Sequence, residues 1–173
     1  MIFLVGGARS GKSSLAESLA SKIGAPVIYI ATAQADDHEM SQRIEEHRRQ
    51  RPQDWQVVEA PIDVEEALRS APDGATVVVD CVTLWISNLM VERDGDTIIG
   101  MVDSVIAASV SRSGETIVVS NEVGSGVVPM HPVGRRFRDL QGRANQRLAK
   151  AARMAYLVVA GKALRLEAAD DVV

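Results

Sequence analysis

The segment from Gly6 to Ser13 reads GGARSGKS, and the apolar run Ile2–Val5 stands directly before it. This is the phosphate-binding P-loop pattern, in which a strand enters a glycine-rich turn and a helix leaves it. Gly6, Gly7 and Gly11 can adopt positive φ and let backbone N–H groups approach phosphate oxygens. The predicted phosphate contacts are Gly6, Gly7, Ala8, Arg9, Ser10, Gly11, Lys12 and Ser13. Lys12 would reach the β- and γ-phosphates of a nucleoside triphosphate, and Ser13 would hold Mg²⁺.

A candidate metal-binding carboxylate lies further along the chain. Val77-Val78-Val79-Asp80 is an apolar run that ends in a carboxylate, as in a Walker B strand. An aspartate in that position can hold Mg²⁺ directly or through water. The alternative is that Asp80 caps a helix that begins near Val82.

The segment from residue 36 to residue 52 is rich in charge and contains a histidine. On a helix, a group of its residues falls within roughly 80° of arc: Met40, Arg43, Ile44, His47 and Arg51. Neighbouring guanidinium groups disfavour imidazolium and bind phosphate, so they would help His47 to act as a nucleophile. Pro52 disfavours helical geometry at Arg51. The alternative is a solvated charged helix with an ordinary histidine.

Three other features have a less specific pattern. Glu122 follows an apolar run and begins a glycine-containing loop, so it could meet a metal or a substrate hydroxyl, or simply cap the turn. A later helix carries Arg135, Arg136, Arg138, Arg143, Arg147 and Arg153, which are either solvated or in contact with phosphate or nucleic acid. We interpret His38, His131 and Cys81 as structural.

Composition excludes several classes of protein. The net charge of −4 argues against nucleic acid as a partner. The single cysteine among 173 residues allows no intrachain disulfide. Since no stretch is long and apolar enough for a membrane span and no signal peptide is evident, we expect a cytoplasmic protein.

Short apolar runs alternate with helical patterns, which predicts an α/β protein of the P-loop NTPase type, a single domain over 1–173 with a mainly parallel sheet flanked by helices. We expect the last residues to form a loose acidic tail. In such a sheet, ligands bind at the carboxyl ends of the strands. The predicted strands are 2–5, 27–31, 56–59, 76–80, 116–120, 155–160 and 163–166. The predicted helices are 13–23, 64–70, 84–92, 96–111 and 133–153.

The motifs together resemble the bifunctional adenosylcobinamide kinase/adenosylcobinamide-phosphate guanylyltransferase family of cobalamin biosynthesis. The resemblance covers nearly the whole chain. It rests on GGARSGKS, YIATAQADDHEM, RIEEHRRQRP, WQVVEAP, DCVTLWISNL, NEVGSGVVP and FRDLQGRANQRLA, in that order.

The resemblance implies the activity and several roles. His47 would take GMP from GTP as a phosphoramidate, and adenosylcobinamide and its phosphate would be the acceptors. It further implies GTP contacts at the P-loop and at Ala31, Thr32, Ala33, Arg48, Arg49, Gln50, Arg51, Glu59 and Asp80. Some members of the family have glutamate where this chain has Asp80, which leaves the mode of metal contact open. The choice of ATP or GTP for the kinase step also stays open. The family's trimers imply a homo-oligomer. The alternative is a P-loop small-molecule or nucleotide kinase without guanylyltransferase activity.

Overall fold

The computed structural model describes residues 1–24, 26–34 and 38–168. Within these residues the strands form one seven-stranded sheet with the order β3-β2-β4-β5-β1-β6-β7. Strands β1 to β6 pair in parallel, and β7 pairs antiparallel to β6. Most of the strands are continuous apolar runs, as expected where helices cover both faces of a sheet. Their bounds are β1 (Ile2–Gly6), β2 (Val27–Ala31), β3 (Gln56–Glu59), β4 (Thr76–Asp80), β5 (Thr116–Asn121), β6 (Met154–Val159) and β7 (Lys162–Leu166).

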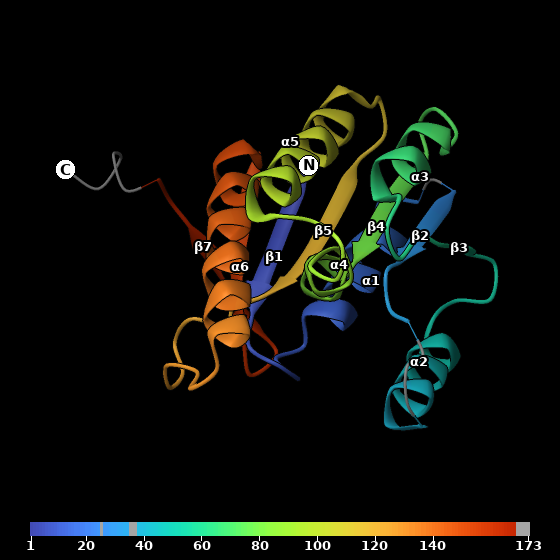
Figure 1. The fold of residues 1–173 in the computed structure, drawn as a ribbon. Helices are drawn as coiled ribbons and strands as arrows, with labels where there is room; N and C mark the ends of the chain where they lie inside the picture. Colours follow the sequence, from blue (N-terminus) through green and yellow to red (C-terminus); the bar gives the residue numbers. More distant parts are fainter. Residues whose placement is uncertain (25, 35–37, 169–173) are drawn as a thin grey trace.

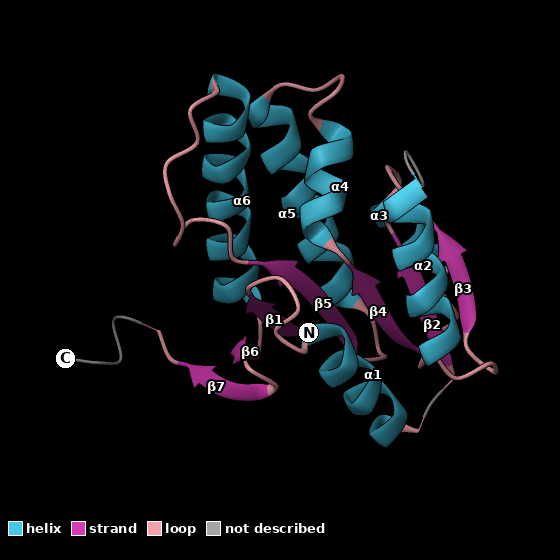
Figure 2. Ribbon diagram, turned by 90° about the horizontal axis from the view of Figure 1, so that it is seen from below, coloured by secondary structure: helices cyan, strands magenta, loops and turns pink. Residues whose placement is uncertain are grey.

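Helices lie on both faces of this sheet, as Figure 2 shows. On one face α1 (Lys12–Ile23) buries Ala16 and Ala20 in an apolar cluster that includes Tyr29 and Val78. The other face is covered by α3 (Val64–Ser70), α4 (Val82–Leu89), α5 (Gly95–Ser111) and α6 (Pro132–Ala151), which enclose the larger core. None of the described helices combines the length and the apolar composition that a membrane crossing requires.

The carboxyl ends of the parallel strands meet at one edge of the sheet. Gly6 at the end of β1 lies opposite Asn121 in β5, and Ala31 at the end of β2 lies opposite both Asp80 and Glu59. In Figure 1 this edge is the lower one, and helix α2 (His38–Gln50) lies beyond it, outside the two helical layers. The predicted gathering of motifs at this edge is confirmed.

The predicted fold class is confirmed, and the differences concern the ends of elements. Helix α4 begins at Val82, earlier than predicted, and ends at Leu89. Its last turn gives way to a turn that leads to Asp94, whose carboxylate accepts a hydrogen bond from the backbone N–H of Thr97 at 2.8 Å and so begins α5. Strand β6 ends at Val159 because Ala160 and Gly161 both adopt positive φ, which turns the chain back into β7.

Candidate active site

The P-loop follows β1 and packs against the end of β6 and the turn that joins β6 to β7. A Cβ atom at Gly6 would collide with the carbonyl oxygen of Val158, so this position requires glycine for a close approach. Gly11 has a φ of 99°, which also favours glycine. From the far side, the backbone N–H of Gly161 donates to the carbonyl oxygen of Ser10 at 2.8 Å. Within the loop, Gly11 and Arg9 adopt positive φ, whereas Gly6 and Gly7 do not.

Lys12 crosses the loop from the first turn of α1. Its side chain is buried, and its ammonium group donates to the carbonyl oxygen of Gly7 at 2.6 Å and to the hydroxyl of Ser10 at 3.4 Å. Burial lowers the pKa of Lys12, although the nearby Asp80 carboxylate opposes that change. The two hydrogen bonds hold the ammonium group inside the loop, where its positive charge can neutralise phosphate oxygens.

Ser13 in the first turn of α1 and Asp80 at the end of β4 lie close together. The hydroxyl of Ser13 donates to Oδ2 of Asp80 at 3.4 Å, and the phenol of Tyr29 donates to the same oxygen. A hydroxyl beside a carboxylate is the oxygen donor set that Mg²⁺ accepts together with substrate phosphates. The N-cap alternative for Asp80 is wrong, since Cys81 occupies that position without a side-chain hydrogen bond. Burial, followed by the Asp80 carboxylate, raises the pKa of Tyr29, so this phenol remains a donor.

Helix α2 lies beyond the carboxyl edge of the sheet (Figure 1), and the side chain of His47 in its last turn is exposed. The two arginines that directly follow His47 pair with carboxylates. Arg48 pairs with Glu59 on β3 at 3.3 Å, and Arg49 pairs with Glu45 at 3.5 Å. The side chains of Arg43 and Gln50 lie outside the described part of the structure.

Arg51 is buried, whereas Arg48 and Arg49 are exposed. Its guanidinium lies 4.0 Å from the centre of the Tyr29 ring, and its Nε donates to the carbonyl oxygen of His47 at 3.0 Å. The expected grouping of Arg51 with His47 is thus present through the backbone of His47 rather than through its imidazole.

The sequence is similar to known proteins along nearly its entire length. The family model described as cobinamide kinase / cobinamide phosphate guanyltransferase matches residues 2–166. The bifunctional adenosylcobalamin biosynthesis protein CobP of Pseudomonas aeruginosa is 43% identical over 165 residues, which cover 95% of this chain and 95% of that protein. The bifunctional adenosylcobalamin biosynthesis protein CobU of Escherichia coli is 39% identical over 181 residues, which cover 96% of this chain and 99% of that protein. The chain belongs to this family.

A solved structure with a similar fold comes from a more distant protein. It is described as a prototypical ATPase from the type III secretion system of pathogenic bacteria, with a TM-score of 0.53 at 13% sequence identity. The similarity covers 90% of this chain and 51% of the ATPase, so the chain spans about half of that protein's length. At this identity the likeness concerns the fold alone, and it agrees with the P-loop architecture.

Among the other residues expected to bind nucleotide in this cobinamide kinase family member, Thr32 has a structural role. Its buried hydroxyl donates to the carbonyl oxygen of Cys81 at 2.8 Å and accepts from the Cys81 backbone N–H at 2.8 Å. The amide of Asn88 donates to the Thr32 carbonyl oxygen at 2.9 Å. These bonds hold the ends of β2 and β4 together. Ala31 and Ala33 flank Thr32 and are partly exposed at the edge of the sheet.

Glu17 is a site residue that sequence reasoning missed. It lies one helical turn after Ser13 on α1 and interacts electrostatically with His47 and Arg51. Burial raises the pKa of its carboxyl, and the two basic side chains oppose that change. The available signal was its spacing of four residues from Ser13, which places both side chains on one face of α1.

Glu122 caps its own loop. Its carboxylate accepts from the backbone N–H groups of Gly124 at 2.6 Å and Ser125 at 3.1 Å. Burial alone would raise the pKa of Glu122. The hydrogen bonds from the Ser125 side chain and from the two backbone N–H groups outweigh this effect and lower the pKa. The arrangement matches the capping alternative.

The arginines of α6 and the residues just after it have partners within the protein. Arg135 donates to the carbonyl oxygens of Pro129 and Met130, and Arg136 donates to that of Arg93. Carboxylates pair with the others: Arg138 with Asp139, Arg143 with Asp96, Arg147 with Asp103 and Arg153 with Glu115. These contacts therefore do not indicate a surface dedicated to phosphate or nucleic acid.

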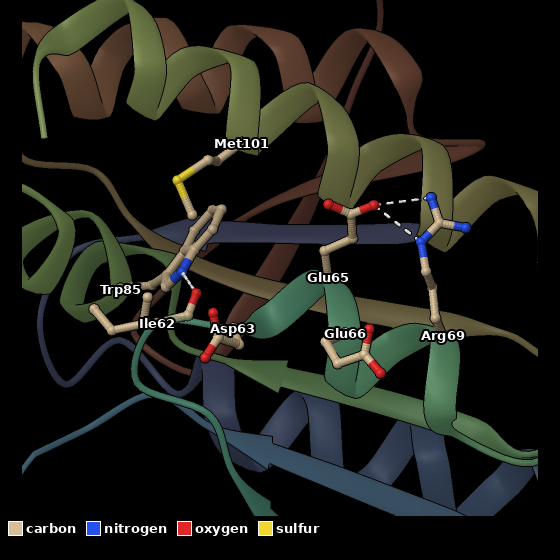
Figure 3. Close-up of a pocket in the computed structure, with 7 residues that line it drawn as sticks. All are labelled: Ile62, Asp63, Glu65, Glu66, Arg69, Trp85 and Met101. Atoms are coloured by element: carbon tan, nitrogen blue, oxygen red, sulfur yellow. Dashed lines mark hydrogen bonds and ion pairs between the residues drawn. The ribbon is translucent and has the colours of Figure 1, made fainter.

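A separate pocket of about 250 Å³ lies on the face of the sheet opposite to α1 (Figure 3). Trp85 forms part of its wall and donates through its indole N–H to the carbonyl oxygen of Ile62 at 2.7 Å. No residue of the predicted nucleotide site is among its lining residues, which are Ile62, Asp63, Glu65, Glu66, Arg69, Trp85 and Met101.

Proposed function

We propose that this chain phosphorylates adenosylcobinamide and then transfers GMP from GTP to adenosylcobinamide phosphate through a guanylylated His47, with both activities in one domain. The observation that supports this most is the match to the bifunctional family over residues 2–166, which includes both the P-loop and the histidine segment. Curated relatives that are described as bifunctional adenosylcobalamin biosynthesis proteins align over 95% or more of the chain.

In the kinase step, the acceptor hydroxyl of the corrinoid attacks the γ-phosphorus of a nucleoside triphosphate. The bond from that phosphorus to the β–γ bridging oxygen breaks and the nucleoside diphosphate leaves, while the attacking hydroxyl gives up its proton to water. The backbone N–H groups of the P-loop and the ammonium of Lys12 bind the phosphate oxygens. Ser13 and Asp80 would hold Mg²⁺, which supplies positive charge to the phosphates.

In the guanylyl transfer, a ring nitrogen of neutral His47 attacks the α-phosphorus of GTP, and pyrophosphate leaves. A phosphate oxygen of adenosylcobinamide phosphate then attacks the same phosphorus, and the bond to His47 breaks. The covalent intermediate divides one difficult transfer into two displacements. His47 is exposed, and its helix α2 lies beyond the carboxyl edge of the sheet (Figure 1), which is compatible with access to a nucleotide held at that edge.

The deciding experiment is incubation of the protein with α-labelled GTP and Mg²⁺, followed by mapping of any adduct. We expect label on His47 that is lost in acid and survives alkali, as a phosphoramidate does. The His38→Ala and His131→Ala variants serve as controls and should still be labelled. If cobinamide is phosphorylated but no adduct forms, the protein is a kinase without the second activity. An acid-stable adduct would contradict the role of His47.

We also propose that the protein is a homo-oligomer. The loop after β5 and the start of α6 expose the large apolar side chains of Val127, Val128, Met130 and Val133. Apolar side chains gathered in this way are typical of an interface. Light scattering coupled to gel filtration measures the mass, and a monomer at micromolar concentration would contradict the proposal.

A further inference from the structure

Tyr29 lies between the two parts of the proposed site. It is only 3% exposed, and its backbone in β2 pairs with Val78 in β4 and Val57 in β3. Its hydroxyl donates to Asp80, which belongs to the metal-binding part. Its ring carries the guanidinium of Arg51, which belongs to the histidine segment. One side chain therefore contacts both parts.

Arg51 depends on this ring for its position. The side chain is 8% exposed, and its Nη1 has no hydrogen-bond partner among the described residues. A buried guanidinium without a full set of acceptors is unfavourable, and an aromatic face at 4.0 Å offsets part of that cost. If the ring were removed, Arg51 would lose this cation–π contact and keep only the bond to His47 and the electrostatic interaction with Glu17 among the interactions described here.

The bond from Arg51 to His47 acts on the end of α2. Nε donates to the carbonyl oxygen of His47, which lies in the last turn of the helix, at 3.0 Å. A basic group that satisfies a carbonyl in the last turn stabilises the end of a helix. A further link from α2 to the sheet, Arg48 with Glu59, joins two exposed side chains, and such pairs contribute little.

We infer that Tyr29 is a positioning residue that links the metal-binding carboxylate to the nucleophilic histidine: its hydroxyl orients Asp80, and its ring holds Arg51 and thereby the last turn of α2. This inference rests on the roles proposed above for Asp80 and His47. It assigns Arg51 to holding α2.

The two contacts of Tyr29 can be separated by substitution. Trp55 lies beside the ring, with centroids 6.5 Å apart, and the surrounding apolar cluster includes Val27 and Val78. The ring of a Tyr29→Phe variant should therefore stay in place and keep Arg51, while only the bond to Asp80 is lost. Tyr29→Leu removes both contacts. Tyr156→Phe is the matched control, because the hydroxyl of Tyr156 contacts the sulfur of Met154 in β6, outside the site.

The experiment combines three measurements on these variants. Hydrogen–deuterium exchange of the nucleotide-free protein reports on α2, Mn²⁺ binding beside a non-hydrolysable GTP analogue is followed by electron paramagnetic resonance, and labelling by GTP follows guanylylation. We expect Tyr29→Phe to weaken Mn²⁺ binding about fivefold, as one lost hydrogen bond would, and to leave exchange in α2 unchanged. We expect Tyr29→Leu to speed exchange in the last turn of α2 about tenfold and to slow guanylylation at saturating Mg²⁺ to the same extent. Its kinase rate should equal that of Tyr29→Phe.

Each arm has a result that overturns it. Wild-type Mn²⁺ binding in Tyr29→Phe would contradict the link to Asp80, and unchanged exchange in Tyr29→Leu would contradict the link to α2. If Tyr29→Leu does not fold, Arg51→Met tests the second link, because it should also speed exchange in the last turn of α2, and unchanged exchange in this variant would contradict the link. A wild-type protein that forms no GMP adduct contradicts the proposed function, whereas the exchange measurement needs no nucleotide and still decides the link.

Discussion

The P-loop and helix α2 lie at the same edge of the sheet but are attached to it in different ways. The P-loop joins a fully buried strand to a helix packed on the core, and the turn between β6 and β7 supports it from the other side. Its Lys12 is buried. Helix α2 is strongly charged, most of its described side chains are exposed, and Arg51 after its last turn is the buried contact that fixes its end.

This difference suggests how one small domain can combine two reactions. Phosphate binding needs donors that are already in place before the substrate arrives, and the core supplies that rigidity. A nucleophile that must attack and later release a phosphoryl group can sit on an element with few buried contacts, which opens more easily. Damage to the P-loop should therefore affect both activities, whereas damage to α2 should affect one.

The largest effect is expected from Lys12→Ala. Loss of the ammonium removes charge stabilisation from every triphosphate bound in the loop, so we expect both activities to fall by at least about a hundredfold. Rates of cobinamide phosphorylation and of GMP transfer check this, with Lys22→Ala at the exposed end of α1 as the control. Guanylyl transfer near the wild-type rate would show that it uses a separate nucleotide site.

The second substitution, His47→Ala, should divide the two activities. We expect no GMP adduct and no guanylyl transfer, because the nucleophile is gone. Phosphorylation of cobinamide should stay within about threefold of wild type, since the kinase step needs the acceptor hydroxyl, Mg²⁺ and Lys12. His38→Ala, at the exposed start of the same helix, is the control. An equal loss of both activities would mean that α2 shapes the nucleotide site as a whole.

A third test separates two adjacent glycines of the P-loop. Gly6→Ala would force a Cβ onto the carbonyl oxygen of Val158, whereas a Cβ at Gly7 meets nothing within 4 Å. We expect Gly6→Ala to cost about 1–3 kcal/mol of stability, as overpacking does, and to weaken nucleotide binding. Gly7→Ala should be nearly neutral in stability. Urea unfolding and nucleotide titration measure both effects, and equal behaviour of the two variants would contradict the support of the loop by β6.

The sequence predicted the fold and the P-loop well because both depend on local patterns. Continuous apolar runs mark buried parallel strands, and the spacing of Gly6, Gly11 and Lys12 is fixed by the turn itself. Helix and strand ends were less accurate. The end of β6, for example, depends on the conformation of Ala160, which no local pattern announces.

The parts of the site that sequence reasoning missed depend on register between distant strands. Tyr29 reaches Asp80 only because β2 pairs with β4, and nothing in the run around Tyr29 indicates a polar role. Arg51 was expected to bind phosphate, yet its position over that ring follows from the path of the chain after α2. Glu17 likewise interacts electrostatically with His47 because of the placement of two helices that are separated in the sequence.

The smallest effect is expected from a substitution of Glu122 in the loop after β5, which lies at the same edge. This substitution tests whether every acidic residue at the edge takes part in the chemistry. Because the Glu122 carboxylate accepts from two backbone N–H groups, we expect Glu122→Gln to lower the free energy of unfolding by about 1 kcal/mol at pH 7 and to leave both activities within about threefold. The pKa of Glu122 is lowered in the folded protein, so its stabilisation is present above the ordinary value of 4.5 and fades as the pH falls through the lowered pKa. The difference between variant and wild type should therefore shrink on acidification, as urea unfolding at several pH values can measure, with the exposed Glu92→Gln as the control. A large loss of activity at unchanged stability would instead mean that this carboxylate acts on the substrate or the metal, and the contrast between core-built and peripheral parts of the site would have to include a third catalytic element.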